Sequence, residues 1–310
     1  MADLETHAGK YVRQKRGEIE SLKDIPDRKI SQVLNQIDLK LVNDLTSQEL
    51  AKSRAFRADA HSSRKLRSVS IDRADVRLVK FKENIGAAAL EGITGQIIFA
   101  PRKFSANIQE LLKNNFGAFD FAASKILFPS FVTLAFFHEV AHKASTVVET
   151  DGESVIKINS GTDIHSFTVN EEAKPISGEG NDLGELTEAI TTRLELEMSE
   201  QYIARAPIAN VTLDTLREAY KMQLESPQGR NSVVKSLNRF IAVLSEESGI
   251  PQEIVWQAFK EAYFSNRNLE EIQSELKEMT GINIVTNMKF RDMLGDEIAE
   301  ALEELFEKEK

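Results

Sequence analysis

His138 and His142 stand four residues apart, and Glu139 directly follows the first of them. On an α-helix this spacing places both imidazoles on one face, one turn apart. Two neutral imidazoles held in this way supply two ligands of a tetrahedral zinc site. Zinc lowers the pKa of a bound water to about 7, and Glu139 could accept a proton from that water. The three residues therefore predict a zinc centre in which Glu139 acts as the catalytic base.

The surroundings of this motif favour a bound metal ion. The motif lies in an apolar run, Phe128 to Ala141, that carries no other charged residue. Burying two histidines and a glutamate there is unfavourable unless a partner satisfies them, and a metal ion is such a partner. Because the chain contains no cysteine, histidine and carboxylate side chains would have to hold the zinc.

A catalytic zinc site needs a third protein ligand. The position six residues after His142 is Val148, with no glycine before it, which excludes the sites whose third ligand is a histidine at that spacing. A distant glutamate, an aspartate such as Asp163, or His165 could serve instead.

The start of a predicted helix, Leu186 to Glu200, offers the best glutamates for this role. Glu185 and Glu188 both lie there, and the small side chain of Ala189 would let this helix approach the motif helix closely. Either carboxylate could bind zinc. Both could also occupy the first turn only because negative charge interacts favourably with the helix dipole.

Three segments together resemble the gluzincins, which are zinc peptidases with a glutamate ligand on a second helix. They are the His138–His142 motif, a predicted hairpin with Asn159-Ser-Gly161, and Leu186-Thr-Glu188-Ala-Ile-Thr191. The resemblance implies that Glu188, rather than Glu185, is the third ligand of one zinc ion per chain. It also implies a zincin-like core with a small sheet over the motif helix. The expected activity of such a core is the hydrolysis of peptide bonds.

The resemblance extends further along the chain, with two departures. Strand Gln96–Ala100 is similar to the edge strand that binds extended substrates in these enzymes, and residues 248–281 are similar to the helical subdomain that often follows the core. Thr187 stands where asparagine is common, and Thr192 stands where an acidic residue usually binds a ligand histidine. Loss of such an acid weakens metal binding or activity by about 10–100-fold unless another group replaces it.

Two further residues could stabilise the oxyanion that forms during peptide hydrolysis. Tyr220 lies in the predicted helix after the ligand helix, and His165 lies in the second strand of the hairpin. Each also has a simpler role. Tyr220 would pack with Leu216 and Leu224, one helical turn to either side, and a single strand histidine is more often a surface residue.

The function that these residues favour is a zinc-dependent peptidase, with endopeptidase preferred over aminopeptidase, acting on a peptide or protein substrate through a Glu139-activated, zinc-bound water. The alternative is a non-catalytic zinc-site protein that serves as a peptide-binding or interaction module. Replacing Glu139 separates the two, because only the enzyme needs that carboxylate.

The period of the apolar residues predicts a helix-dominated α+β fold in three segments: a charged helical arm at 1–68, the zinc metallopeptidase core at 69–206 and a helical C-terminal subdomain at 207–310. We expect the motif helix to begin at Pro129–Ser130, with Ser130 as its N-cap, and to end near Ser145. A sheet formed by residues 75–82 and 95–100 should be extended by a hairpin at 154–159 and 163–170, followed by a loop at 171–184.

Helices should make up most of the remaining chain. In the arm, a helix after Pro26 should be followed by a second one, capped by Thr46 or Ser47, that runs to about Ala60. Further helices are expected at 106–114, 213–224, 233–248, 252–264, 269–280 and 292–310. Gly249 and Gly281 fall where helix C-caps are expected.

Charge and hydropathy suggest where the protein acts. The chain has a net charge of −10, yet its arm, from Lys10 to Arg67, contains 14 basic and 8 acidic residues. The arm contains no recognised nucleic-acid motif, so we expect no nucleic-acid partner. The N-terminus lacks the apolar core of a signal peptide, and the longest apolar stretch, Ile126 to Ala141, is shorter than a bilayer span. We therefore expect no membrane span and a cytoplasmic location, with non-classical export left open.

Overall fold

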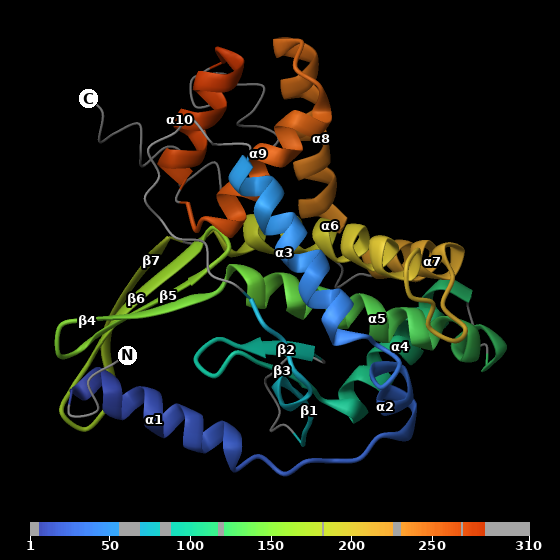
Figure 1. Cartoon of the computed structure of the whole chain (residues 1–310), viewed down its shortest axis with the longest axis horizontal. Helices are drawn as coiled ribbons and strands as arrows, with labels where there is room; N and C mark the ends of the chain where they lie inside the picture. Colours follow the sequence, from blue (N-terminus) through green and yellow to red (C-terminus); the bar gives the residue numbers. More distant parts are fainter. Residues whose placement is uncertain are drawn as a thin grey trace.

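Helices dominate the structure, and the strands form two small sheets (Figure 1). This computed structural model describes residues 6–55, 69–80, 88–116, 121–181, 183–225, 231–267 and 269–282. The helix-dominated α+β class is thereby confirmed. In chain order the elements are α1 (His7–Glu20), α2 (Arg28–Leu34), α3 (Leu39–Ala55), the 3-10 helix η1 (Arg73–Asp75), β1 (Val76–Leu78), β2 (Ala88–Glu91), β3 (Gln96–Phe99), α4 (Pro101–Phe116), α5 (Phe121–Ser145), β4 (Val147–Asp151), β5 (Val155–Ser160), β6 (Asp163–Val169), β7 (Pro175–Asn181), α6 (Gly184–Ile203), α7 (Leu213–Glu225), α8 (Asn231–Ser248), α9 (Gln252–Phe264) and α10 (Leu269–Thr280).

Helix α5 carries the histidine motif and lies at the centre of the main core. It begins at Phe121, so the predicted start at Pro129–Ser130 is wrong, and Pro129 lies inside the helix. Ser130 is not an N-cap, and its hydroxyl is 2.9 Å from the Thr215 hydroxyl on α7. A proline inside a helix removes one backbone hydrogen bond. The contacts of the first turns, such as Phe128 against Phe104 of α4, outweigh that loss.

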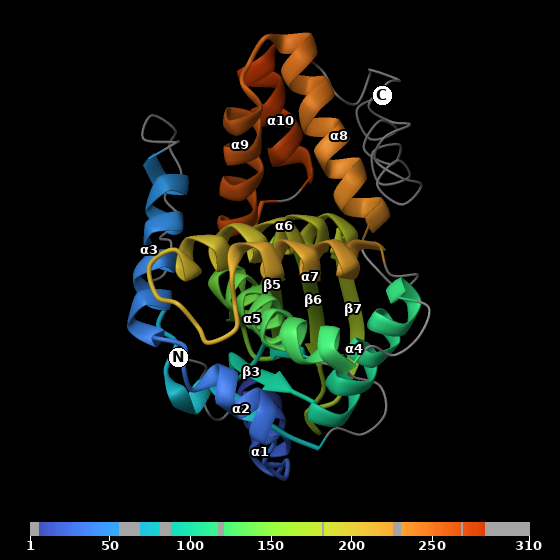
Figure 2. The ribbon, with the colours of Figure 1, turned by 90° about the vertical axis from the view of Figure 1, so that its right-hand side faces the viewer.

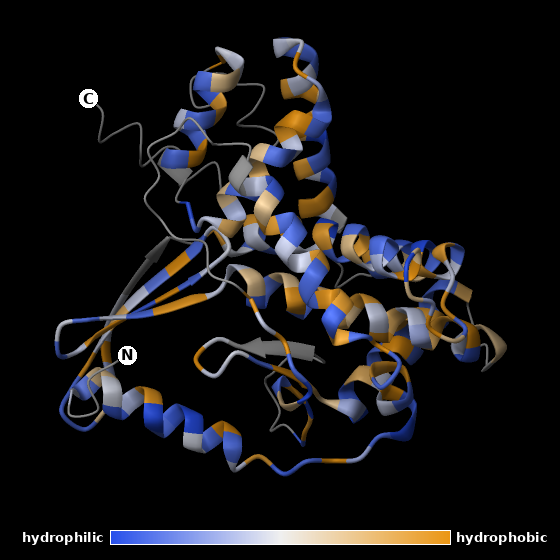
Figure 3. Ribbon diagram, in the orientation of Figure 1, coloured by the Kyte–Doolittle hydropathy of each residue, from blue (hydrophilic) through white to orange (hydrophobic). Residues whose placement is uncertain are grey.

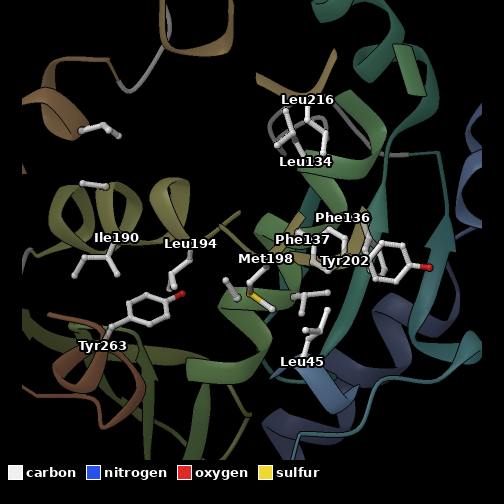
Figure 4. Packing of buried hydrophobic residues seen from close by; sticks show 14 of the residues in the cluster. Leu45, Leu134, Phe136, Phe137, Ile190, Leu194, Met198, Tyr202, Leu216 and Tyr263 are labelled. Atoms are coloured by element: carbon white, nitrogen blue, oxygen red, sulfur yellow. The ribbon is translucent and has the colours of Figure 1, made fainter. Parts of the chain in front are cut away.

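Helices α6 and α7 cover one side of α5, and α8, α9 and α10 project beyond them (Figure 2). The main core is continuous from Ile30 in α2 to Leu276 in α10, so all three segments of the chain contribute to it. Figure 4 shows buried hydrophobic side chains of this core, in which the ring centroids of Phe137 on α5 and Tyr202 on α6 are 5.4 Å apart. The Tyr202 hydroxyl also accepts a hydrogen bond from the backbone N–H of Asp38, at 2.7 Å, which attaches the N-terminal segment to α6.

The first sheet has the order β1-β3-β2. Strand β3 pairs parallel with β1 and antiparallel with β2, so residues 96–99 form the central strand, and the predicted edge strand at Gln96–Ala100 is wrong. The edge position next to α5 belongs to β2 instead. Residues 88–91 (Ala-Ala-Leu-Glu) contain no β-branched or aromatic side chain, so their sequence gives no strand signal.

The second sheet has the order β4-β5-β6-β7 and is separate from the first, so the predicted single extended sheet is wrong. The predicted hairpin is confirmed as β5 and β6. The predicted loop at 171–184 instead contains β7, which begins with Pro175 and is rich in glycine. An edge strand tolerates proline because the missing N–H breaks no ladder bond. Helix α1 is largely hydrophilic (Figure 3), and its N-terminal part packs against this sheet through Tyr11, whose ring lies 5.3 Å from that of Phe167.

The N-terminal helices differ from the prediction in where they begin and end. Asp27 caps α2, and the carboxylate of Asp38 accepts hydrogen bonds from the first backbone N–H groups of α3, so the apolar stretch after Pro26 forms two helices. Thr46 is not an N-cap, because it lies inside α3 and donates a hydrogen bond to the Val42 carbonyl, at 2.8 Å.

The predicted C-terminal helices are confirmed as α7 to α10 within about two residues at each end. Gly249 and Gly281 adopt φ values of 73° and 71°, the left-handed conformation of a helix C-cap. The predicted helix at 292–310 lies outside the described residues. No helix in the described part of the chain is long and apolar enough to cross a membrane.

The internal proline of α5 predicts an unusual stability change. Replacing Pro129 with alanine restores a backbone N–H to the helix, so the free energy of unfolding should rise by about 1–3 kcal/mol, less the packing of the lost ring. Urea unfolding in the presence of a chelator measures this change without a contribution from metal binding. The control is Pro207→Ala, outside any helix, where loss of proline should lower stability slightly or leave it unchanged. A lower stability for Pro129→Ala would contradict this account of α5.

Candidate metal centre

The two motif histidines converge on one point at the C-terminal end of α5. Their Nε2 atoms are 3.2 Å apart. Both rings are almost fully enclosed, with 7% and 12% of the side chains of His138 and His142 exposed. The helix that carries them is apolar around most of its circumference, because it is buried on several sides by α4, α6 and α7.

Helix α6 brings Glu188 to the same point. One carboxylate oxygen of Glu188 lies 3.2 Å from His142 Nε2 and the other lies 3.5 Å from His138 Nε2. Burial would raise the pKa of Glu188, but hydrogen bonds and charge attraction from the two histidines outweigh burial and hold the pKa well below its usual value. A third of the Glu188 side chain is exposed, although its Oε2 atom is buried.

The three side chains fit a zinc ion. Tetrahedral ligands at about 2.0–2.1 Å from zinc lie about 3.3–3.4 Å from one another, close to the contact distances of 3.2–3.5 Å found here. With one ligand atom taken from each residue, all three atoms lie within 4.8 Å of one another. Two nitrogens and one carboxylate oxygen form a donor set typical of catalytic zinc, which leaves a fourth position open.

Glu195 binds His138 through the ring nitrogen that faces away from the cluster. Its Oε2 atom lies 2.6 Å from His138 Nδ1, and both residues are buried, at 3% and 6% exposure. An Nδ1–H that donates to this carboxylate leaves Nε2 with a lone pair directed at Glu188 and His142. Glu195 thus makes the contact with a motif histidine that the resemblance to gluzincins led us to expect from position 192, where this chain has a buried threonine.

Sequence reasoning missed Glu195, although one signal was present. Glu195 follows Glu188 by seven residues, which is two helical turns, so both carboxylates lie on the same side of α6. The acid expected four residues after the ligand is absent, because position 192 is a threonine. The next acidic residue on the same face of the helix as Glu188 is Glu195.

Glu139 and Tyr263 lie close to the cluster. Glu139 is 5% exposed, although it carries a carboxylate. Burial raises the pKa of the Tyr263 hydroxyl, and the negative charges of Glu188 and Glu139 raise it further. Glu139 directly follows the cluster residue His138 on α5, and Tyr263 contacts the ligand helix α6 through Thr191, with 2.9 Å between the two hydroxyls. The sequence offered no signal for Tyr263, because it is an apolar-face residue of a distant helix.

The other residues considered from the sequence are not part of this cluster. Glu185 is exposed in the first turn of α6. His165 has 57% of its side chain exposed on β6, where its Nε2 lies 2.8 Å from Asp163 Oδ2. Tyr220 is half-buried on α7, and its pKa is raised by burial and by the charge of Glu195, the carboxylate that binds His138.

Known proteins add nothing to this assignment. No protein-family model matches the chain, and no curated protein or solved structure matches it. The candidate centre therefore rests on the geometry of His138, His142, Glu188 and Glu195.

The ligand set predicts how zinc content depends on individual residues. The purified protein should contain about one zinc per chain, and His142→Ala or Glu188→Ala should each lose most of it, because two remaining ligands bind zinc weakly. Elemental analysis after dialysis measures the content, and His165→Ala serves as a control with a histidine removed elsewhere. Stoichiometric zinc in both ligand variants would refute the assignment.

The hydrogen bond from His138 to Glu195 predicts a more graded effect. Glu195→Gln keeps the size of the side chain but removes its charge, so zinc affinity should fall by about 10–100-fold. Competition with a chelator measures the dissociation constant. Glu200→Gln is the matched control. Glu200 lies on the same helix, but its carboxylate binds the exposed Arg217 and not a histidine. Equal affinity in the two variants would show that Glu195 does not support His138.

Proposed function

We propose that this protein is a zinc-dependent peptidase with His138, His142 and Glu188 as zinc ligands and Glu139 as general base. The observation that carries the proposal is that two imidazole nitrogens from α5 and a carboxylate from α6 converge at distances suited to zinc. Glu139 supports it because this second carboxylate is buried and directly follows the ligand residue His138 in the sequence.

The chemistry follows from the positions of these side chains. A zinc ion bound there would polarise the scissile carbonyl and lower the pKa of an attacking water. Glu139 would accept the proton from the attacking water and pass it to the leaving amine nitrogen. The Glu195–His138 hydrogen bond fixes the ring of His138 with Nε2 toward the cluster. Because Glu195 fills the role of the acid absent at Thr192, that departure from the family pattern does not argue against activity.

The first sheet suggests how a peptide would bind. Strand β2 is at the edge of this sheet and contacts α5, the helix with both histidines. An edge strand can pair with an extended peptide through backbone hydrogen bonds, which recognise any sequence. A peptide added to β2 would run alongside α5. Such binding would accept the middle of a peptide chain, so it favours an endopeptidase over an aminopeptidase.

Glu139→Gln tests the chemistry. The substitution keeps the shape of the side chain and removes the base, so cleavage of peptides should fall by at least about 10²-fold while zinc content stays unchanged. A diverse peptide library analysed by mass spectrometry supplies the substrates, and elemental analysis supplies the zinc content. Glu149→Gln, an exposed carboxylate on β4, should cleave as wild type does.

Two outcomes would reject the proposal. If Glu139→Gln cleaves the library as fast as wild type, Glu139 is not the base. If wild type leaves the library intact with zinc bound, the non-catalytic zinc-site protein becomes the better description.

A further inference from the structure

The turn between β5 and β6, residues 160–162, lies where three parts of the molecule meet. It contacts the end of α5 just after His142, the start of α6 just before Glu188, and the end of α9. We call these contacts the junction, formed by the turn together with Ser145, Thr146, Thr187, Thr191, Tyr263 and Asn266.

Asn266 connects α5 to the turn from the side of α9. Its amide nitrogen donates to the carbonyl of Ser145, the last residue of α5, at 2.7 Å, and to the carbonyl of Gly161 at 2.9 Å. Both amide hydrogens are thus used, each on a different element. Asn266 is 7% exposed and adopts a φ of +52°, in the left-handed region where asparagine is among the few residues that are tolerated.

Tyr263 packs directly on the turn. A Cβ atom added to Gly161, whose φ is +63°, would lie 2.5 Å from a ring carbon of Tyr263 and 3.0 Å from the methyl carbon of Thr187. Only glycine permits this approach. The fully buried hydroxyl of Tyr263 lies 2.9 Å from the hydroxyl of Thr191 on α6, so α9 contacts both the turn and the ligand helix.

Thr187 attaches the turn to α6. Its hydroxyl accepts a hydrogen bond from the backbone N–H of Thr162 at 3.1 Å and lies 3.3 Å from the Ser160 carbonyl. Thr187 directly precedes Glu188, so these hydrogen bonds fix the backbone of α6 next to the ligand residue. The same contact gives a reason for threonine at this position, where the family pattern has asparagine.

The end of α5 is attached in a similar way. The Thr146 hydroxyl donates to the His142 carbonyl, at 2.7 Å, and lies 3.1 Å from the Ser160 hydroxyl. The carbonyl of the ligand residue His142 is therefore linked through one side chain to the same turn that binds Thr187.

We propose that Asn266 and Thr187 are positioning residues that set the distance between His142 and Glu188. The two ligands come from separate helices, and a shift of about 1 Å between those helices would spoil a tetrahedral site. The junction binds both helices within four residues of a ligand and is closed by α9. The C-terminal helices thus belong to the metal centre although they provide no ligand. This inference rests on the zinc site proposed above.

Asn266→Gly tests the inference with two readouts other than activity. Glycine accepts the left-handed backbone but removes both hydrogen bonds. Chelator competition should show zinc binding about tenfold weaker than in wild type, and the visible absorption of the Co²⁺-substituted protein should change, because it reports ligand geometry. The matched control is Asn210→Gly, which replaces an exposed asparagine of φ +64° away from the junction and should leave both readouts unchanged.

A second pair of variants keeps the test valid if Asn266→Gly fails to fold. Thr187→Val has the shape of threonine without its hydroxyl, and Thr187→Ser keeps the hydroxyl. The valine variant should lose zinc affinity by about tenfold, and the serine variant should retain it. A role in overall stability alone would instead lower the urea midpoint of Thr187→Val and leave its zinc affinity unchanged.

The outcomes separate this inference from the proposed function. If wild type binds neither Zn²⁺ nor Co²⁺, the metal site is wrong and the inference fails with it. If wild type binds both ions, and Asn266→Gly and Thr187→Val bind them with wild-type affinity and spectrum, the metal site stands and the junction does not position it.

Discussion

The contact between α5 and α6 is the constraint on which the rest of the structure depends. These two helices pack along each other and contribute His138, Glu139 and Glu195, which are buried, and His142 and Glu188, which lie beside the main core. So many ionisable groups in an apolar interface are unfavourable unless they satisfy one another or bind an ion. The remaining elements hold this interface in register. For example, Lys260 of α9 lies 3.3 Å from Glu49 of α3 and 3.5 Å from Glu197 of α6, so the N-terminal and C-terminal parts of the chain meet on the ligand helix.

The sequence predicted those features that depend on local periodicity. The C-terminal helices have clear apolar stripes, α8 and α10 end at left-handed glycines, and the β5–β6 hairpin has alternating residues around Gly161, so both were placed correctly. The histidine pair needs only helical spacing to share a face. The approach of Glu188 to this pair was an expectation from small Ala189 and from the family resemblance, and the structure brings the three side chains together.

Features that depend on tertiary contacts were missed. Helix α5 continues through Pro129 because its first turns are packed, and β2 and β7 form because a neighbouring strand supplies their hydrogen bonds, although their residues favour neither strand. The support of His138 by Glu195 and the contacts of Tyr263 and Asn266 join residues more than 50 positions apart. The seven-residue spacing from Glu188 is a signal for Glu195, but no spacing rule predicts the contacts of Tyr263 and Asn266, because these are set by how helices pack.

Anomalous diffraction at the zinc absorption edge, from crystals of the zinc-loaded protein, tests the central claim most directly. The account predicts one strong peak about 2.0–2.2 Å from His138 Nε2, His142 Nε2 and a carboxylate oxygen of Glu188, with the Glu195 carboxylate still bound to His138 Nδ1. A peak at other residues, or zinc-loaded crystals in which these three side chains coordinate nothing, would contradict it.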